Sequence, residues 1–97
     1  MEGGTIDGLS TALNLEITVK DGRVVQRNFD DYPLLGLREA PRDIEVHVVA
    51  SNATPSGCGE MGMPTVAPAL CNAIFNASGK RIRVLPIRDQ LRSGLAA

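Results

Sequence analysis

Residues 15–20 alternate strictly between apolar and polar side chains, and Asp21-Gly22 follows them. A period of two is that of a half-buried β-strand. Asp-Gly is a favoured two-residue hairpin turn, because glycine tolerates the positive φ that such turns require. The pattern therefore predicts an antiparallel hairpin over residues 15–29.

The same alternation returns twice further along the chain. Over residues 43–50 it predicts a strand in which apolar and polar side chains point to opposite faces. His47 falls on the polar face, which favours a solvated histidine over a catalytic one. Residues 81–85, which begin with the same alternation, predict a last strand, closed by Pro86.

A longer stretch has the composition of a buried helix. Residues 65–78 carry apolar side chains on nearly every side. Proline is tolerated in the first turn of a helix, so Pro68 predicts a helix that begins near Thr65. Gly79 stands where a C-terminal cap belongs.

The remaining segments give weaker patterns. Residues 1–14 predict a short helix, with a flexible end running into one helical turn as the alternative, and residues 88–97 predict a frayed turn. Residues 28–42 contain two prolines, which exclude a long helix. Their several leucines predict contact with a hydrophobic surface, either within this chain or outside it.

Composition limits how large a core the chain can form. Its 97 residues make one domain at most, residues 1–97, with no Trp, one Tyr and two Phe to fill a core. The predicted elements give a single α+β domain, in which an antiparallel hairpin and further strands pack with one buried helix. We expect so thin a core to need a partner surface.

Charge and cysteine content exclude several classes of function. The net charge of −1 does not favour nucleic-acid binding. Residues 80–97 carry +4 and residues 1–79 carry −5, which indicates a docking face or, more commonly, a solvated strand and tail. Two cysteines and one histidine make a poor metal-ligand set, so we expect free thiols and no metal site. Neither a membrane span nor a secretory signal is predicted.

A glycine-rich loop at residues 57–62 contains one carboxylate, Glu60, directly before the predicted helix. Two interpretations stay open: a general base, since glycines and apolar neighbours let a ligand enclose the carboxylate, and a solvent-exposed turn acid. The glycine spacing also matches a dinucleotide-binding fingerprint. We reject it, because residues 51–56 separate the loop from its strand and no acidic residue follows at the expected distance.

The run GCGEMGMPTVAPALCNAIFNASGKRIRVLPI closely resembles the C-terminal end of the molybdenum-binding subunit of the xanthine dehydrogenase/aldehyde oxidase family. Within that family, the run is similar to the beta subunits of the isoquinoline 1-oxidoreductase type. Further matches are EGGTIDGLSTAL, GRVVQRNFDDYPLL and IEVHVVAS, so the resemblance covers almost the whole chain. It implies a fragment of the molybdopterin-binding domain of a molybdenum hydroxylase.

The resemblance also implies a chemistry and the residues that serve it. In this family the Glu at the position of Glu60 takes the proton from a molybdenum-bound hydroxide, and water-derived oxygen is inserted into an aldehyde or N-heteroaromatic carbon. The metal is held by a pterin, as molybdopterin cytosine dinucleotide, and by no protein side chain. The cofactor-binding positions implied are Glu2, Gly3, Gly4, Gly57 and Gly59. Cys58 and Met61 depart from the usual pattern, which leaves the substrate undetermined.

Such subunits are many times longer than this chain. We therefore expect a C-terminal segment that is inactive and binds no cofactor alone. The implied partners are the remainder of the molybdenum subunit, an iron–sulfur subunit and a small-molecule aldehyde or N-heterocycle. The alternative is a small stand-alone α+β protein-interaction domain without catalysis. The sequence assigns neither substrate nor compartment.

Overall fold

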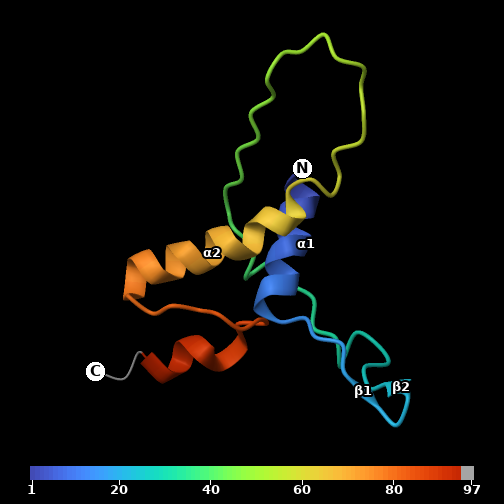
Figure 1. The fold of residues 1–97 in the computed structure, drawn as a ribbon, viewed down its shortest axis with the longest axis vertical. Helices are drawn as coiled ribbons and strands as arrows, with labels where there is room; N and C mark the ends of the chain where they lie inside the picture. Colours follow the sequence, from blue (N-terminus) through green and yellow to red (C-terminus); the bar gives the residue numbers. More distant parts are fainter. Residues whose placement is uncertain (95–97) are drawn as a thin grey trace.

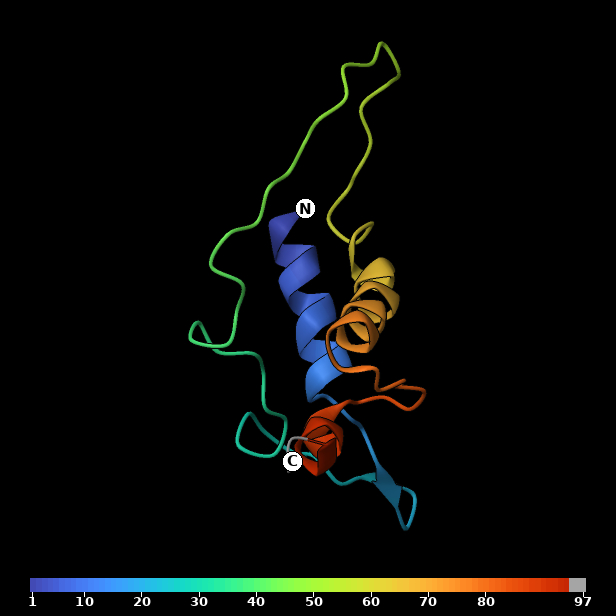
Figure 2. The same ribbon diagram turned by 90° about the vertical axis from the view of Figure 1, so that its left-hand side faces the viewer.

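The computed structural model describes residues 1–94 (Figure 1). Two α-helices, a two-stranded antiparallel hairpin and a 3₁₀ helix follow one another: α1 at Glu2–Leu13, β1 at Val19–Lys20, β2 at Arg23–Val24, α2 at Met63–Ser78, and the 3₁₀ helix at Arg88–Gly94. A long segment between β2 and α2 has no regular structure, and its middle part projects away from the helices in both views (Figures 1 and 2).

Helices α1 and α2 pack directly against each other, and Gly8 lies at their contact. Gly8 is buried, and a Cβ placed on it would come within 2.8 Å of the Met63 carbonyl oxygen and 2.9 Å of the Val66 Cγ2 atom. Only a residue without a side chain permits this approach. Glycine weakens a helix when considered alone, but here Gly8 allows two helices to come together.

Replacing Gly8 with Ala is expected to destabilise this contact. Ala is favoured over Gly within a helix by about 1 kcal/mol, but overpacking against a backbone carbonyl costs about 1–3 kcal/mol. Gly3→Ala is the matched control, because a Cβ on Gly3 meets nothing within 4 Å. Urea unfolding followed by helical circular dichroism should separate the two variants by about the cost of the clash. Equal stabilities would contradict the close packing at Gly8.

Helix α1 also holds two segments that are distant in the sequence. The buried Ser10 hydroxyl accepts a hydrogen bond from the Leu35 amide at 2.9 Å, and the Ala12 carbonyl accepts one from the Ile87 amide at 2.9 Å. The buried apolar side chains are few and gather around this helix: Ala12, Leu15, Val66, Ile82 and Ile87. The core therefore lies where α1, α2 and the segment before the 3₁₀ helix meet.

The predicted hairpin is confirmed at its turn, and its strands are shorter than expected. Val19 pairs with Val24 and Lys20 with Arg23, in antiparallel register. The turn residue Asp21 has a φ of 51° and the glycine after it a φ of 74°, as a two-residue hairpin turn requires. Beyond these two pairs, the Thr18 carbonyl accepts a hydrogen bond from the Val25 amide at 2.9 Å. The Gln26 side chain then takes the place of a backbone partner and accepts a hydrogen bond from the Thr18 amide at 2.8 Å, so the strands do not extend over residues 15–29.

The further strands predicted at residues 43–50 and 81–85 are not formed. Among the described residues, the only paired strands are β1 and β2. Both segments are without a neighbouring strand, and an isolated strand has no hydrogen-bond partner to stabilise it. Alternation predicts which side chains share a face, but it cannot supply the second strand. His47 is solvent-exposed, as its place on the polar face predicts.

Helix α2 matches the predicted C-terminus and differs at its start and in its burial. Gly79 has a φ of 71° and its amide donates to the Phe75 carbonyl at 2.8 Å, which confirms the predicted cap. The helix begins two residues earlier than expected, at Met63, so Pro68 lies beyond the first turn. An amide at position 68 would donate to the carbonyl of Pro64, and Pro64 is an exposed residue, so water can serve that carbonyl instead.

The prediction of a buried helix was wrong for this chain, because Val66 is the one buried residue of α2 among those described. The radius of gyration is 16.3 Å, against about 13 Å for a compact domain of this length. The accessible surface is 8089 Å², against about 5,400 Å² for a compact monomer of this mass. The chain thus leaves much apolar surface uncovered. None of the helices described is both long and apolar enough to span a membrane.

A turn at residues 27–31 is held by the Asp31 carboxylate. Its Oδ1 atom accepts hydrogen bonds from the amides of Asn28 at 2.9 Å and Arg27 at 2.8 Å. These two bonds lower the pKa of Asp31 below 3.8. The leucines that follow this turn, within residues 28–42, are only partly covered, and Leu34 and Leu37 are exposed.

The contribution of Asp31 to folding should therefore depend on pH. The pKa of Asp31 is lower in the folded state than in the unfolded state, where it is near 3.8. The stabilisation is therefore fully present at a pH above 3.8, and it is lost as the pH falls through the lower pKa of the folded state. An NMR titration of the carboxyl carbon should give a midpoint below 3.8, and Asp31→Asn should abolish the parallel titration of the Arg27 and Asn28 amides. A midpoint at or above 3.8 would contradict the turn.

Candidate functional site

The loop that carries Glu60 contacts the N-terminal turn of α1. A Cβ placed on Gly4 would lie 2.3 Å from the Gly59 carbonyl oxygen and 4.0 Å from the Glu60 Cα atom. One placed on Gly62 would lie 3.3 Å from the Thr5 hydroxyl. Two stretches that are far apart in the sequence are therefore in backbone contact. They are the stretches in which site residues were predicted.

The start of α2 fixes the direction in which the loop approaches. The Glu60 carbonyl accepts a hydrogen bond from the Met63 amide at 3.1 Å, and the Gly62 carbonyl accepts one from the Thr65 hydroxyl at 2.8 Å. Pro64 follows within the first turn, where its fixed φ suits a helix and its missing N–H is not needed. Glu60 is thus held at the N-terminal end of α2, as the sequence predicted.

The carboxylate of Glu60 is exposed, and no described residue makes a hydrogen bond or ion pair with it. A Cβ on Gly57 or on Gly59 would meet nothing within 4 Å. Neither glycine has a positive φ, so special backbone angles do not explain them. Their effect is that a bulky ligand can reach the main chain beside Glu60.

The other predicted cofactor-binding residues lie at the beginning of α1. Glu2 and Gly3 are exposed, and Gly4 is half-buried against the loop. Glu2 also lines an open hollow of about 470 Å³, whose other walls are residues 41–45 of the projecting segment. The fold therefore places Glu2, Gly3 and Gly4 on the same side of the molecule as the glycine loop.

Sequence reasoning did not recognise how α1 receives the loop and α2. Gly4 and Gly8 are one helical turn apart and so share a face of α1. The i, i+4 spacing of two glycines is a signal for close packing of another backbone, and it was available in the sequence. Gly4 contacts the Glu60 loop and Gly8 contacts α2, so this face positions the site.

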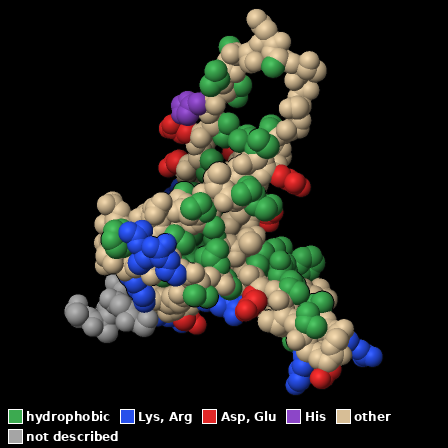
Figure 3. All heavy atoms as spheres, viewed as in Figure 1, with side chains coloured by type: hydrophobic (Ala, Val, Ile, Leu, Met, Phe, Trp, Pro, Cys, Tyr) green, Lys and Arg blue, Asp and Glu red, His purple; other side chains and the backbone are tan. Residues whose placement is uncertain are grey.

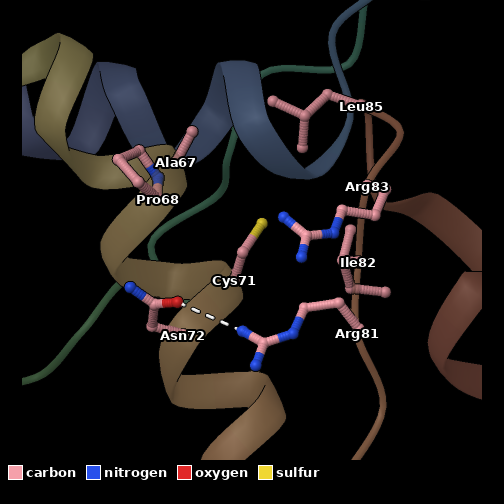
Figure 4. A pocket seen from close by; sticks show the side chains of 8 residues that line it. All are labelled: Ala67, Pro68, Cys71, Asn72, Arg81, Ile82, Arg83 and Leu85. Carbon is pink, nitrogen blue, oxygen red and sulfur yellow. Dashed lines mark hydrogen bonds between the residues drawn. The ribbon is translucent and has the colours of Figure 1, made fainter.

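A second hollow, of about 310 Å³, lies between α2 and the segment after it (Figure 4). Its lining includes the Cys71 side chain and two arginines, Arg81 and Arg83. Arg81 donates to the Asn72 amide oxygen at 3.4 Å and lies over the Phe75 ring at 3.4 Å from its centroid. The described lining contains no carboxylate or imidazole to serve as a base, and none of the predicted site residues lies in it.

Basic residues gather near the C-terminal end of α2 (Figure 3). Several basic residues that follow α2 in the sequence have partners inside the chain. Arg88 pairs with Glu16 at 2.7 Å, Arg92 pairs with Asp89 at 3.2 Å, and Lys80 donates to the Gln90 carbonyl. These contacts favour the interpretation that the uneven charge belongs to a solvated, internally paired surface rather than to a docking face.

Other candidate residues do not converge on the site. His47 lies 3.3 Å from the Glu45 carboxylate on the projecting segment, and both side chains are exposed. Cys58 is exposed and Cys71 is half-buried, and both are free thiols. Within residues 1–94 no three His, Cys, Asp or Glu side chains are placed so that they could hold a metal ion.

Comparison with known proteins identified relatives that match nearly the whole chain, whereas no family model matches it. The chain is 39% identical over 101 residues to isoquinoline 1-oxidoreductase subunit beta of Brevundimonas diminuta, covering 100% of this chain and 13% of the relative. It is 39% identical over 93 residues to the membrane-bound aldehyde dehydrogenase [pyrroloquinoline-quinone] of Gluconacetobacter polyoxogenes, covering 94% and 12%. It is 29% identical over 92 residues to the aldehyde oxidoreductase molybdenum-binding subunit PaoC of Escherichia coli K12, covering 88% and 13%. The chain thus spans about an eighth of the length of these relatives.

Proposed function

Since the chain is homologous along its whole length to a segment of the molybdenum-binding subunits of the xanthine dehydrogenase family, we propose that it works as one segment of such a subunit. The whole protein would oxidise an aldehyde or an N-heteroaromatic compound. In it, this chain supplies the general base, Glu60, together with part of the cofactor-binding surface. The isolated segment would have no activity, because seven-eighths of the relatives' length lies outside it.

The contact between Gly4 and the Gly59 carbonyl is the observation that best supports this proposal. It brings the start of α1, with Glu2, Gly3 and Gly4, to the loop that carries Gly57, Gly59 and Glu60. A stand-alone interaction domain has no need for two glycine-rich backbones to meet beside one carboxylate. A catalytic site does, because a rigid and uncluttered backbone lets a large ligand lie close to the base.

In this proposal Glu60 accepts a proton from a water-derived nucleophile. The residue is suited to that role, because its loop is fixed at one end by the first turn of α2 and at the other by α1. Its carboxylate has no competing partner among the described residues. In the complete subunit the remaining protein and the substrate would exclude water from the loop, which strengthens a base–proton interaction.

The cofactor proposed is a molybdenum–pterin, in its cytosine dinucleotide form, which supplies the redox chemistry when bound. The open main chain at Gly57 and Gly59 fits a broad ligand of this kind, since among the described residues nothing beyond their chain neighbours lies within 4 Å of a Cβ placed on either glycine. The described residues contain no ligand cluster for a bare metal ion, and a metal carried by an organic ligand needs none. We further propose an iron–sulfur subunit as electron-transfer partner.

Three measurements on the native protein test the proposed function. An antibody against this chain should detect a polypeptide several times larger than 10.3 kDa. The purified protein should contain molybdenum, and it should oxidise aldehydes or N-heteroaromatic compounds with oxygen taken from ¹⁸O-labelled water. A native product of 10.3 kDa without molybdenum would instead support the stand-alone interaction domain. A full-length protein that contains a quinone and no molybdenum would contradict the proposed cofactor.

A further inference from the structure

We propose that residues 43–49 form a β-strand by pairing with a strand of the subunit outside this chain. In Figures 1 and 2 this segment leads into the projecting part of the fold, and only its first residues stay beside Glu2 of α1. It has no regular secondary structure, and among the described residues none of its backbone N–H or C=O groups has a hydrogen-bond partner. Backbone groups in this state are a template for a second strand.

The side chains of the segment have the pattern of a strand with one covered face. Ile44, Val46 and Val48 occupy one face by alternation, and Glu45 and His47 occupy the other. In this chain Val46 is 42% exposed and Val48 is 90% exposed. β-branched residues that alternate with polar ones are favoured on a pleated, half-buried surface. The face that carries these exposed valines therefore has the pattern of a buried face, but no part of the described chain packs against it.

The length of the relatives identifies the occupant. The match to the isoquinoline 1-oxidoreductase subunit covers all of this chain, residues 43–49 included, and only 13% of that relative. The surface of the chain also exceeds that expected for a compact monomer by about half. Polypeptide that is continuous with the chain in the full subunit is therefore available to cover it, at the highest effective concentration of any partner.

The proposed strand would also serve the candidate site. Residues 41–45 and Glu2 line one open hollow, so the start of the segment lies beside the N-terminal turn of α1. Pairing of residues 43–49 into a sheet would hold this wall in place. The inference rests on the proposal that the chain is part of a larger subunit, and it does not depend on which cofactor or substrate that subunit uses.

Hydrogen–deuterium exchange of the full-length subunit tests the pairing without using activity. The amides of residues 43–49 should exchange at least about 100-fold more slowly than an unstructured peptide, as paired strands do. Val46→Asp should restore fast exchange there, because it places a charge on the covered face. His47→Asp is the matched control on the opposite face and should keep the protection.

Unprotected amides in the wild-type subunit would overturn the inference, even if the protein contains molybdenum and is active. Protection that appears only at high protein concentration would also overturn it, since a second copy would then be the partner. Protection in a protein that lacks molybdenum and turnover would support the pairing and contradict only the proposed function. If Val46→Asp fails to fold, the exchange rates of the wild-type subunit still decide.

Discussion

Replacing Glu60 with Gln in the full-length subunit is expected to lower kcat by about 10²–10⁴-fold, the usual contribution of a general base. Gln has nearly the same shape and cannot accept the proton, so the loop and its contacts with α1 and α2 should persist. Molybdenum content should therefore stay at the wild-type level. Steady-state kinetics and metal analysis of the same preparation measure both quantities.

The control for this variant removes a different carboxylate from the same region. Asp7→Asn changes an exposed side chain on α1 that has no place in the proposed site, and it should leave kcat within a factor of about two. Unchanged turnover in Glu60→Gln would assign Glu60 to the turn alone and remove it from the mechanism. Loss of molybdenum in that variant would indicate a structural role in cofactor binding.

The variant Gly4→Ala is expected to lower kcat by about 100-fold without changing any group that reacts, since a displacement near 1 Å at a catalytic residue is enough. The added methyl group would lie 2.3 Å from the Gly59 carbonyl oxygen, a distance that no carbon–oxygen contact tolerates. The clash is with backbone, so either the loop or the start of α1 must move. Glu60, the next residue in the loop, moves with it.

Thr11→Ala is the comparison for Gly4→Ala. It also places Ala on α1 and removes only a hydrogen bond from the Thr11 hydroxyl to the Asp7 carbonyl, at 3.0 Å on the exposed side. This variant should retain turnover. A Gly4→Ala subunit with full activity would show that the contact between α1 and the loop does not position the base. Equal loss in both variants would point to general damage to α1.

The sequence predicted the features that depend on local chemistry. The positive φ values at Asp21 and Gly22, and the cap at Gly79, follow from what these residues allow. The Glu60 loop and its place before α2 were also predicted, because the glycines, proline and apolar run lie next to one another in the sequence. The resemblance to the molybdenum-binding subunits rests on the same motifs.

The predictions that failed concern features that depend on neighbouring strands and surfaces, which the sequence of this chain does not contain. Residues 43–50 alternate correctly, yet alternation cannot form a sheet without a second strand. Helix α2 has apolar residues on nearly every side, but burial depends on what surrounds it, and most of it is exposed. The contact between Gly4 and the Gly59 carbonyl was missed for a different reason. Hydrophobic periodicity does not report where two backbones approach each other.

Helix α1 has a consequence for the order of folding. Its contacts reach Leu35, the loop before α2, α2 itself and Ile87, so each segment that docks on it is further along the chain than the last. The entropy cost of closing such loops rises with their length, and non-local contacts slow folding. Within this segment α1 precedes Leu35, α2 and Ile87, so its contacts with them can form only after each of them has been synthesised.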